Sequence, residues 1–237
     1  MIAGDIAVSC ELSYLGDNQG MHEAQTRGGG SNLSAANKIR FSQSALVCGE
    51  SFQRLAEGLI SAIWTVKEGA HQVMPDEMGN VVACATNLAF AVELYLKGIL
   101  VQLGLDVPMS HNLRVLYDAI PQSVRTLIES IYDTALPDEV RRLDGRVSFT
   151  CAIGPSGELS WDDYKVSLAL PDLLERSKDL FVSWRYAFEF SPPVSSPYQI
   201  REFEYGLLRC AAEVLRVELT VRLDQTEERP THFDPGI

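Results

Sequence analysis

The stretch VVACATNLAFAVELYLKGILVQL, residues 81–103, decides the fold of this chain. Wound as an α-helix it is apolar on nearly every side, and its two charged residues are Glu93 and Lys97. A helix that is apolar all round belongs at the centre of a bundle, because no side of it favours contact with water. We therefore expect a central helix over roughly 77–103, buried by other helices.

Amphipathic helices are predicted on both sides of this segment. Before it, in a helical pattern that starts at Ser34, apolar residues recur every three or four positions through Phe52, Leu59 and Ile63, which is one helical stripe. After it, breakers separate four more helical patterns, over about 111–120, 122–136, 170–188 and 198–225. The sum predicts an all-α fold, an up-and-down bundle of five or six helices.

The last of these patterns carries two apolar stripes. One runs from Ile200 through Cys210 and Val214 to Val221, and the other from Leu208 to Leu223. A helix with two apolar faces packs on both sides, either inside its own bundle or at a seam between subunits. The sequence leaves both alternatives open, with the core interpretation favoured.

Three segments stand outside the helical pattern. Residues 1–33 are polar and end in the glycine-rich RGGGSN, so we expect a flexible N-terminal tail. Residues 226–237 are acidic and contain proline, which predicts a loose C-terminal tail. Between about 144 and 169 apolar and polar residues alternate before a GPSG turn, which favours a short extended or β-hairpin insertion. The helical domain is predicted to span 34–225.

Composition excludes several classes of function. The 237 residues carry a net charge of -12 that is spread along the whole chain. A protein that coats itself in nucleic acid, or binds a membrane through basic residues, needs the opposite balance. The longest uncharged run, 78–92, is shorter than the roughly 20 residues that cross a bilayer. We therefore expect no membrane partner.

The cysteines and histidines show no metal-binding or disulfide pattern. The five cysteines are far apart and never form a CxxC pair, which indicates a reducing compartment and predicts a cytoplasmic protein. The four histidines lack metal-ligand spacing, and no phosphate-binding or nucleophile motif occurs. No metal and no cofactor are expected.

Candidate functional residues are the polar ones that interrupt apolar helices. Glu93 and Lys97 lie four residues apart on one face of the central helix and form either a polar strip in a groove or an ordinary surface ion pair. Arg185 and Glu189 repeat this spacing in SWRYAFEF. One hypothesis pairs Arg185 with Glu93 and Glu189 with Lys97 across the bundle. His111 is either a capping residue or a group that handles protons near neutral pH.

The order of these segments resembles a known family. ELYLKGILVQLG, then HNLRVLYDAIP, then SWRYAFE are similar to segments of bacterial HEPN (higher eukaryote and prokaryote nucleotide-binding) domain proteins, over about residues 76–190. The resemblance implies a helical homodimer with a polar groove, often a ribonuclease or toxin component encoded beside a nucleotidyltransferase or a phage-defence protein. By motif match it implies one polar cluster, formed by Glu93, Lys97, His111, Arg185, Tyr186 and Glu189.

The chain departs from the ribonuclease members of that family. Their signature is an arginine followed by four to six residues and a histidine, and none of the four histidines here has an arginine at that spacing. The sequence therefore favours a binding or regulatory module, of a toxin–antitoxin or phage-defence system, that holds a nucleotide or nucleic-acid phosphate. Catalysis is left open, leaning against an enzyme. One alternative is a divergent metal-independent ribonuclease toxin that uses His111 with Arg185 and Lys97 at a dimer groove, with RNA as substrate. The other is a purely structural interaction protein whose polar cluster serves fold specificity. The partner proteins considered are a nucleotidyltransferase and an antitoxin.

Overall fold

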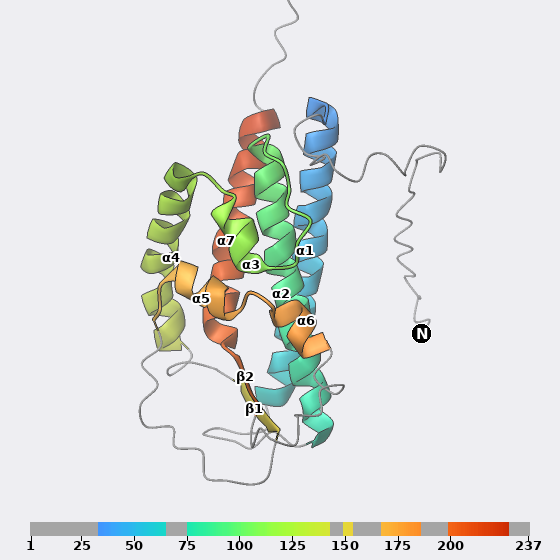
Figure 1. Ribbon diagram of the computed structural model, residues 1–237, viewed down its shortest axis with the longest axis vertical. Coiled ribbons are helices and arrows are strands. Elements are labelled where there is room, and N and C mark those ends of the chain that lie inside the picture. Colours follow the sequence, from blue (N-terminus) through green and yellow to red (C-terminus); the bar gives the residue numbers. More distant parts are fainter. Residues whose placement is uncertain (1–32, 65–74, 143–148, 154–166, 186–198, 228–237) are drawn as a thin grey trace, which may run out of the picture.

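The fold is a bundle of four long helices with short elements packed across it (Figure 1). The computed structural model describes residues 33–64, 75–142, 149–153, 167–185 and 199–227. The long helices are α1 (Ala35–Trp64), α2 (Pro75–Gln102), α4 (Gln122–Arg142) and α7 (Tyr205–Glu227). The expectation of a mostly helical fold is confirmed.

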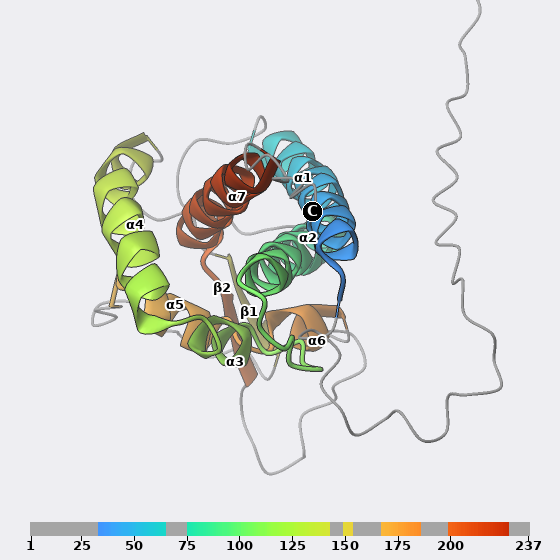
Figure 2. The ribbon, with the colours of Figure 1, turned by 90° about the horizontal axis from the view of Figure 1, so that it is seen from above.

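Helix α2 lies at the centre, as its sequence predicts. It packs against α1 and α7 on one side and against the short helices α3 (Leu113–Asp118) and α6 (Leu180–Arg185) on the other, an arrangement seen from above in Figure 2. Its side chains dominate the core, and Leu88, Leu96 and Ile99 are fully buried. Each side of α2 faces another helix, so its apolar side chains are buried all round.

Two glycines allow α2 to approach its neighbours closely. A Cβ at Gly49 of α1 would lie 2.4 Å from Cε1 of Tyr95 on α2, and a Cβ at Gly98 of α2 would lie 2.7 Å from Cδ2 of Leu219 on α7. The hydroxyl of Ser42 on α1 donates to the carbonyl of Gly98 at 3.2 Å. The close contacts of α2 with α1 and α7 thus depend on glycine at positions 49 and 98, because any larger residue would overlap its neighbour.

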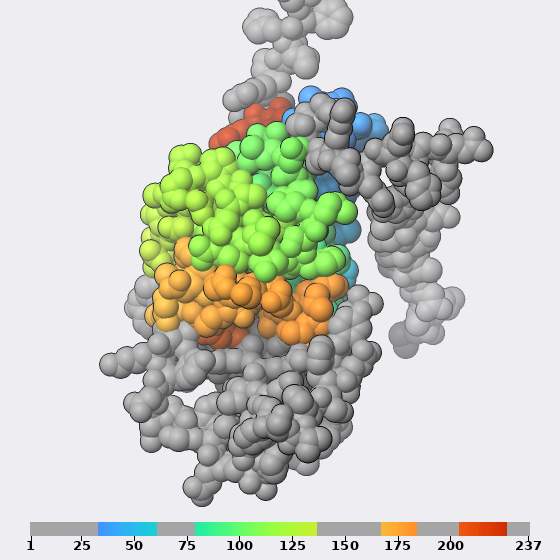
Figure 3. Space-filling view, in the orientation of Figure 1, coloured from blue at the N-terminus to red at the C-terminus, as the bar shows by residue number. Residues whose placement is uncertain are grey.

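The short helices cover the remaining side of α2 (Figure 3). The prediction of one helix over 170–188 is wrong for the described part, since α5 (Leu170–Arg176) and α6 are separated by a break. At that break the carbonyl of Lys178 accepts a hydrogen bond from the backbone N–H of Leu113 at 3.2 Å. In a continuous helix this carbonyl would accept a hydrogen bond from a backbone N–H of the same helix. Here it accepts instead from the start of α3.

The predicted insertion contains a strand, but its partner is distant in sequence. Strand β1 (Phe149–Ile153) pairs antiparallel with β2 (Gln199–Phe203), Phe149 opposite Phe203 and Ile153 opposite Gln199. A partner strand within 144–169 lies outside the described residues. The helix predicted to begin at 198 instead begins at Tyr205, because short apolar runs fit either period and long-range pairing decides between them.

The ends of the predicted domain are described only in part. The N-terminal tail lies outside the described residues, except for residue 33, and so does the C-terminal tail from residue 228. Thr226, assigned to that tail, lies in α7, where its hydroxyl donates to Gln102 of α2 at 3.2 Å. Helix α7 therefore ends at Glu227, slightly later than the pattern of apolar residues indicated.

Within the described residues one segment, Gly79–Gln102, is long and apolar enough to cross a membrane. Most of it, 72% of its apolar window, is buried inside the protein. Core helices and membrane-spanning helices share this composition, and packing against neighbours on both sides accounts for it here.

The two glycines of α1 give opposite predictions for alanine. Gly49→Ala should destabilise the protein by about 1–3 kcal/mol, because the new methyl group overlaps the buried ring of Tyr95. Gly58→Ala meets no atom within 4 Å and should stabilise by about 0.5–1 kcal/mol through helix propensity. Denaturant unfolding of both variants measures this, and equal shifts in the same direction would contradict the packing described.

Candidate functional site

The first candidate site is centred on a buried carboxylate in the middle of α2. Glu93 is 1% exposed and is flanked along the helix by Val92 and by Leu96, which are fully buried. A carboxylate removed from water in this way is costly unless its oxygens accept hydrogen bonds. Its surroundings therefore have to provide donors.

Two donors meet the carboxylate of Glu93. Nζ of Lys97, one turn along α2, lies 2.6 Å from Oε1. Nδ1 of His111, in the segment between α2 and α3, lies 3.0 Å from Oε2 and 3.1 Å from Oε1. Because a carboxylate accepts, the contact assigns the proton to Nδ1, so that Nε2 is the ring nitrogen left for a ligand.

The imidazole of His111 also stacks on an aromatic ladder. Its ring lies 5.2 Å from that of Phe181 on α6, with 27° between the planes. Phe181 in turn stacks on Phe90 of α2 at 5.3 Å, and Phe90 meets Phe52 of α1 edge-on at 4.8 Å. The ring of His111 is thus fixed on one face by Phe181 and at one edge by Glu93, while 57% of the side chain stays exposed.

Local backbone structure fixes the segment that carries His111. Gly104 ends α2 with a φ of +73°, which glycine adopts without strain. At the far end, Asn112 caps α3 by accepting from the N–H of Val115 at 3.0 Å, and Ser110 accepts from the N–H of Asn112 at 3.0 Å. His111 therefore lies in a segment fixed at both ends.

The structure brings three of the six predicted cluster residues together: Glu93, Lys97 and His111. Arg185 is the last residue of α6, and its side chain, with Tyr186 and Glu189, lies outside what is described, as do the proposed contacts Arg185–Glu93 and Glu189–Lys97. Sequence reasoning missed Phe181 as a site residue. No local signal marks it out, because Phe181 is one of several apolar residues in the helical pattern over 170–188 and its contact with His111 depends on the tertiary structure.

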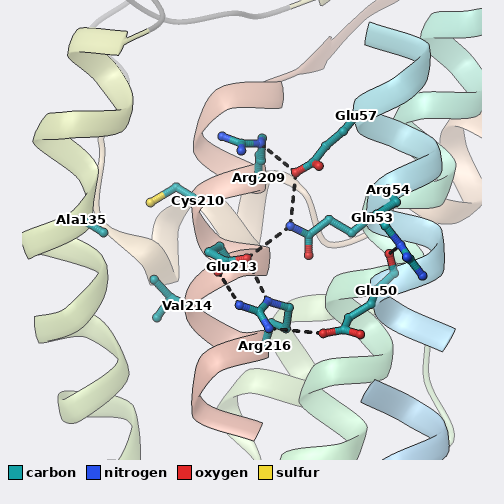
Figure 4. Close-up of a pocket in the computed structure, with 10 residues that line it drawn as sticks. All are labelled: Glu50, Gln53, Arg54, Glu57, Ala135, Arg209, Cys210, Glu213, Val214 and Arg216. Atoms are coloured by element: carbon teal, nitrogen blue, oxygen red, sulfur yellow. Dashed lines mark hydrogen bonds and ion pairs between the residues drawn. The ribbon is translucent and has the colours of Figure 1, made fainter. Parts of the chain in front are cut away.

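A second candidate is a groove on the opposite side of the bundle, lined by α1, α7 and Ala135 of α4 (Figure 4). Its volume is about 600 Å³. The buried amide of Gln53 forms its floor and accepts from the hydroxyl of Tyr95 at 3.0 Å. The sequence does not mark out this groove, because its charged residues read as the ordinary polar faces of two separate helices, α1 and α7.

Most of the charged side chains in this groove form ion pairs with one another. Arg209 binds Glu57 at 2.9 Å, and Arg216 binds Glu213 at 2.7 Å and Glu50 at 3.2 Å. The hydrogen bond from Arg216 lowers the pKa of Glu213 and raises that of Arg216. The ion pairs of Arg209 with Glu57 and of Arg216 with Glu50 join α7 to α1. The groove is therefore better described as a polar contact between two helices than as a ligand site.

No three described His, Cys, Asp or Glu side chains gather closely enough to hold a metal ion. Of the two candidates, the His111 cluster is the stronger one, because it combines an exposed imidazole, a buried carboxylate bound to its Nδ1 and an aromatic ring stacked on its face. Such a group can bind an anion or transfer a proton.

Removing the charge of Glu93 tests the cluster as a structural unit. Glu93→Gln should destabilise the protein by about 1–3 kcal/mol, because an amide cannot accept from both Lys97 and His111 with two oxygens. Glu175→Gln is the matched control, since Glu175 also pairs with a lysine, Lys178, at the surface, and should change stability far less. Denaturant unfolding compares them, and equal losses would contradict the role given to burial.

The groove predicts a pH effect on stability. Since the folded-state pKa of Glu213 is lowered, its contribution is fully present above its unfolded pKa, about 4.3, and is lost as the pH falls through the lower folded value. Glu213→Gln should therefore flatten the acid limb of a stability–pH profile. Asp133→Asn, at an exposed residue of α4, is the control and should flatten the limb less than Glu213→Gln does.

Comparison with known proteins gives no relative for this chain. No protein-family model, no curated protein and no solved structure matches it. Its function is therefore argued from its own residues.

Proposed function

We propose that this protein is a HEPN-like binding or regulatory module that holds a phosphate of a nucleotide or nucleic acid at His111. The observation that carries the proposal is the contact of Nδ1 with the buried Glu93 carboxylate, 3.0 Å away, on a side chain that is 57% exposed. A histidine held in this way has its second nitrogen directed to an incoming group.

The charges around His111 suit a single phosphate. Lys97 offsets the charge of Glu93, so an imidazole that carries a second proton adds a net positive charge at the surface. Its Nε2–H then donates a charge-assisted hydrogen bond to a phosphate oxygen. Because the net charge of -12 is spread along the chain, one small site fits the protein better than a long basic track does.

The aromatic ladder suits the other half of a nucleotide. Phe181 holds one face of the His111 ring and stacks in turn on Phe90. Base–aromatic stacking is a general means of binding single-stranded nucleic acid and free bases. Because Phe181 stacks on both His111 and Phe90, a base would extend this ladder on the face of the exposed His111 ring that Phe181 leaves open.

The resemblance to HEPN proteins supports the same class of ligand. The mostly helical bundle agrees with it, and the missing Arg–His signature favours binding over standard cleavage. A regulatory role in a toxin–antitoxin or phage-defence system, with an antitoxin or nucleotidyltransferase as partner, belongs to this proposal.

One observation favours a second candidate, a divergent metal-independent ribonuclease. A carboxylate that orients a histidine through Nδ1 prepares Nε2 to act as a general base, here on a ribose 2′-hydroxyl. Glu93 would be a positioning residue and His111 the group that removes the proton.

Binding and cleavage are tested on the same proteins. We expect 5′-AMP, ATP or a short single-stranded RNA to bind the wild type in calorimetry, and His111→Ala to weaken binding at least about tenfold. Met109→Ala, at a fully exposed residue of the same segment, is the control and should bind normally. Absence of binding by all three probes would overturn the proposal.

The same variants separate the second candidate from the first. Cleavage of the RNA by the wild type, abolished in His111→Ala and reduced in Glu93→Gln while both stay folded by circular dichroism, would establish the ribonuclease in place of the binding module. Binding without cleavage supports the first proposal.

A further inference from the structure

Lys97 and His111 bind the same oxygen of Glu93. Nζ of Lys97 lies 2.6 Å and Nδ1 of His111 lies 3.1 Å from Oε1, so the two nitrogens are close neighbours. The side chain of Lys97 is 19% exposed and that of His111 is 57% exposed, whereas Glu93 is 1% exposed. Both nitrogen-bearing side chains therefore reach solvent, and a ligand at the imidazole comes near the ammonium group as well.

The ammonium group of Lys97 has donors left for a ligand. It carries three N–H groups, and the carboxylate of Glu93 is its one hydrogen-bond acceptor among the described residues. His111 likewise keeps Nε2 after its Nδ1 has bound Glu93. The cluster thus offers donors from two side chains, which a group with several acceptor oxygens can use at once.

The cations of the neighbouring short helices are already paired. In α3, α5 and the turn that follows α5, every arginine and lysine that the structure describes is bound to a carboxylate. The pairs are Arg114–Asp118 at 2.7 Å, Arg176–Glu204 at 2.8 Å and Lys178–Glu175 at 2.7 Å. These elements therefore do not extend the positive charge of the cluster.

Further carboxylates are exposed on the same side of the bundle. Asp106 lies in the segment before His111, Asp172 lies on α5 and Asp179 lies in the turn after α5, and all three are exposed. Figure 3 shows α3 and α5 side by side on one face. A nucleic-acid strand carries a negative charge at every nucleotide, so a strand laid across this face brings phosphates toward these carboxylates. The cluster is one cationic point on an acidic face.

We propose that the phosphate held at His111 is a phosphomonoester, the terminal phosphate of a nucleotide or of a strand end, and that Lys97 binds it together with His111. This inference rests on the proposed function of the site. A terminal phosphate has three unshared oxygens and carries up to two negative charges at neutral pH, so it can accept from Nζ and Nε2 at once. An internal phosphodiester has one charge and a neighbouring phosphate on either side.

Matched ligands test the class of phosphate by calorimetry on the wild type. We expect 5′-AMP to bind at least about tenfold more tightly than 3′,5′-cyclic AMP, which has the same base and sugar but a diester phosphate. A short RNA with a 5′-phosphate is compared in the same way with the same RNA ending in hydroxyls. Binding of 5′-AMP identifies a free nucleotide as the source, and binding of the phosphorylated RNA alone identifies a strand end.

The outcomes separate this inference from the proposed function on which it rests. A diester probe that binds as tightly as its monoester counterpart overturns the inference and leaves the proposed function standing. No binding by any of the four probes overturns both.

Substitution of Lys97 tests its part in the preference for a monoester. Lys97→Met should bring the affinity for 5′-AMP close to that for cyclic AMP, and Lys97→Arg, which keeps a cation beside Glu93, should retain the difference. Lys178→Met is the matched control, because Lys178 lies on the same side and is paired with Glu175, and it should bind as the wild type does. Circular dichroism checks folding. Equal losses of both affinities in Lys97→Met would show a structural role only and overturn the assignment.

Discussion

The structure depends on the burial of α2 on every side. A helix with almost no polar surface has no face to offer water, so each of its sides must be covered by another element. Helices α1 and α7 cover one side closely, because Gly49 and Gly98 leave room for Tyr95 and Leu219. The short helices α3 and α6 cover the other. The order of the remaining elements follows from the need to surround this one helix.

At Glu93, the side chains that cover α2 are polar. Glu93 is held between Lys97 of its own helix and His111 of the segment that follows it. The buried carboxylate thus joins the core to the segment that leads to α3, and it fixes the orientation of a surface histidine. A buried carboxylate of the core and the best candidate for function are therefore in direct contact.

The two sides of the bundle serve different purposes. On the front, His111, Phe181 and the short helices form a compact polar and aromatic site. On the back, ion pairs such as Arg216–Glu50 hold α1 to α7.

The sequence by itself determined the helical class, the central position of α2 and the proximity of Glu93 to Lys97, because helical periodicity and spacing are local properties. It also singled out His111, although its contact with Glu93 depends on how the chain turns after Gly104. The pairing of β1 with β2, the break between α5 and α6 and the contribution of Phe181 were decided by the tertiary structure alone. Each involves residues far apart in the chain, so no local pattern encodes them, and the same apolar spacing serves a core or an interface until the neighbouring helices are in place.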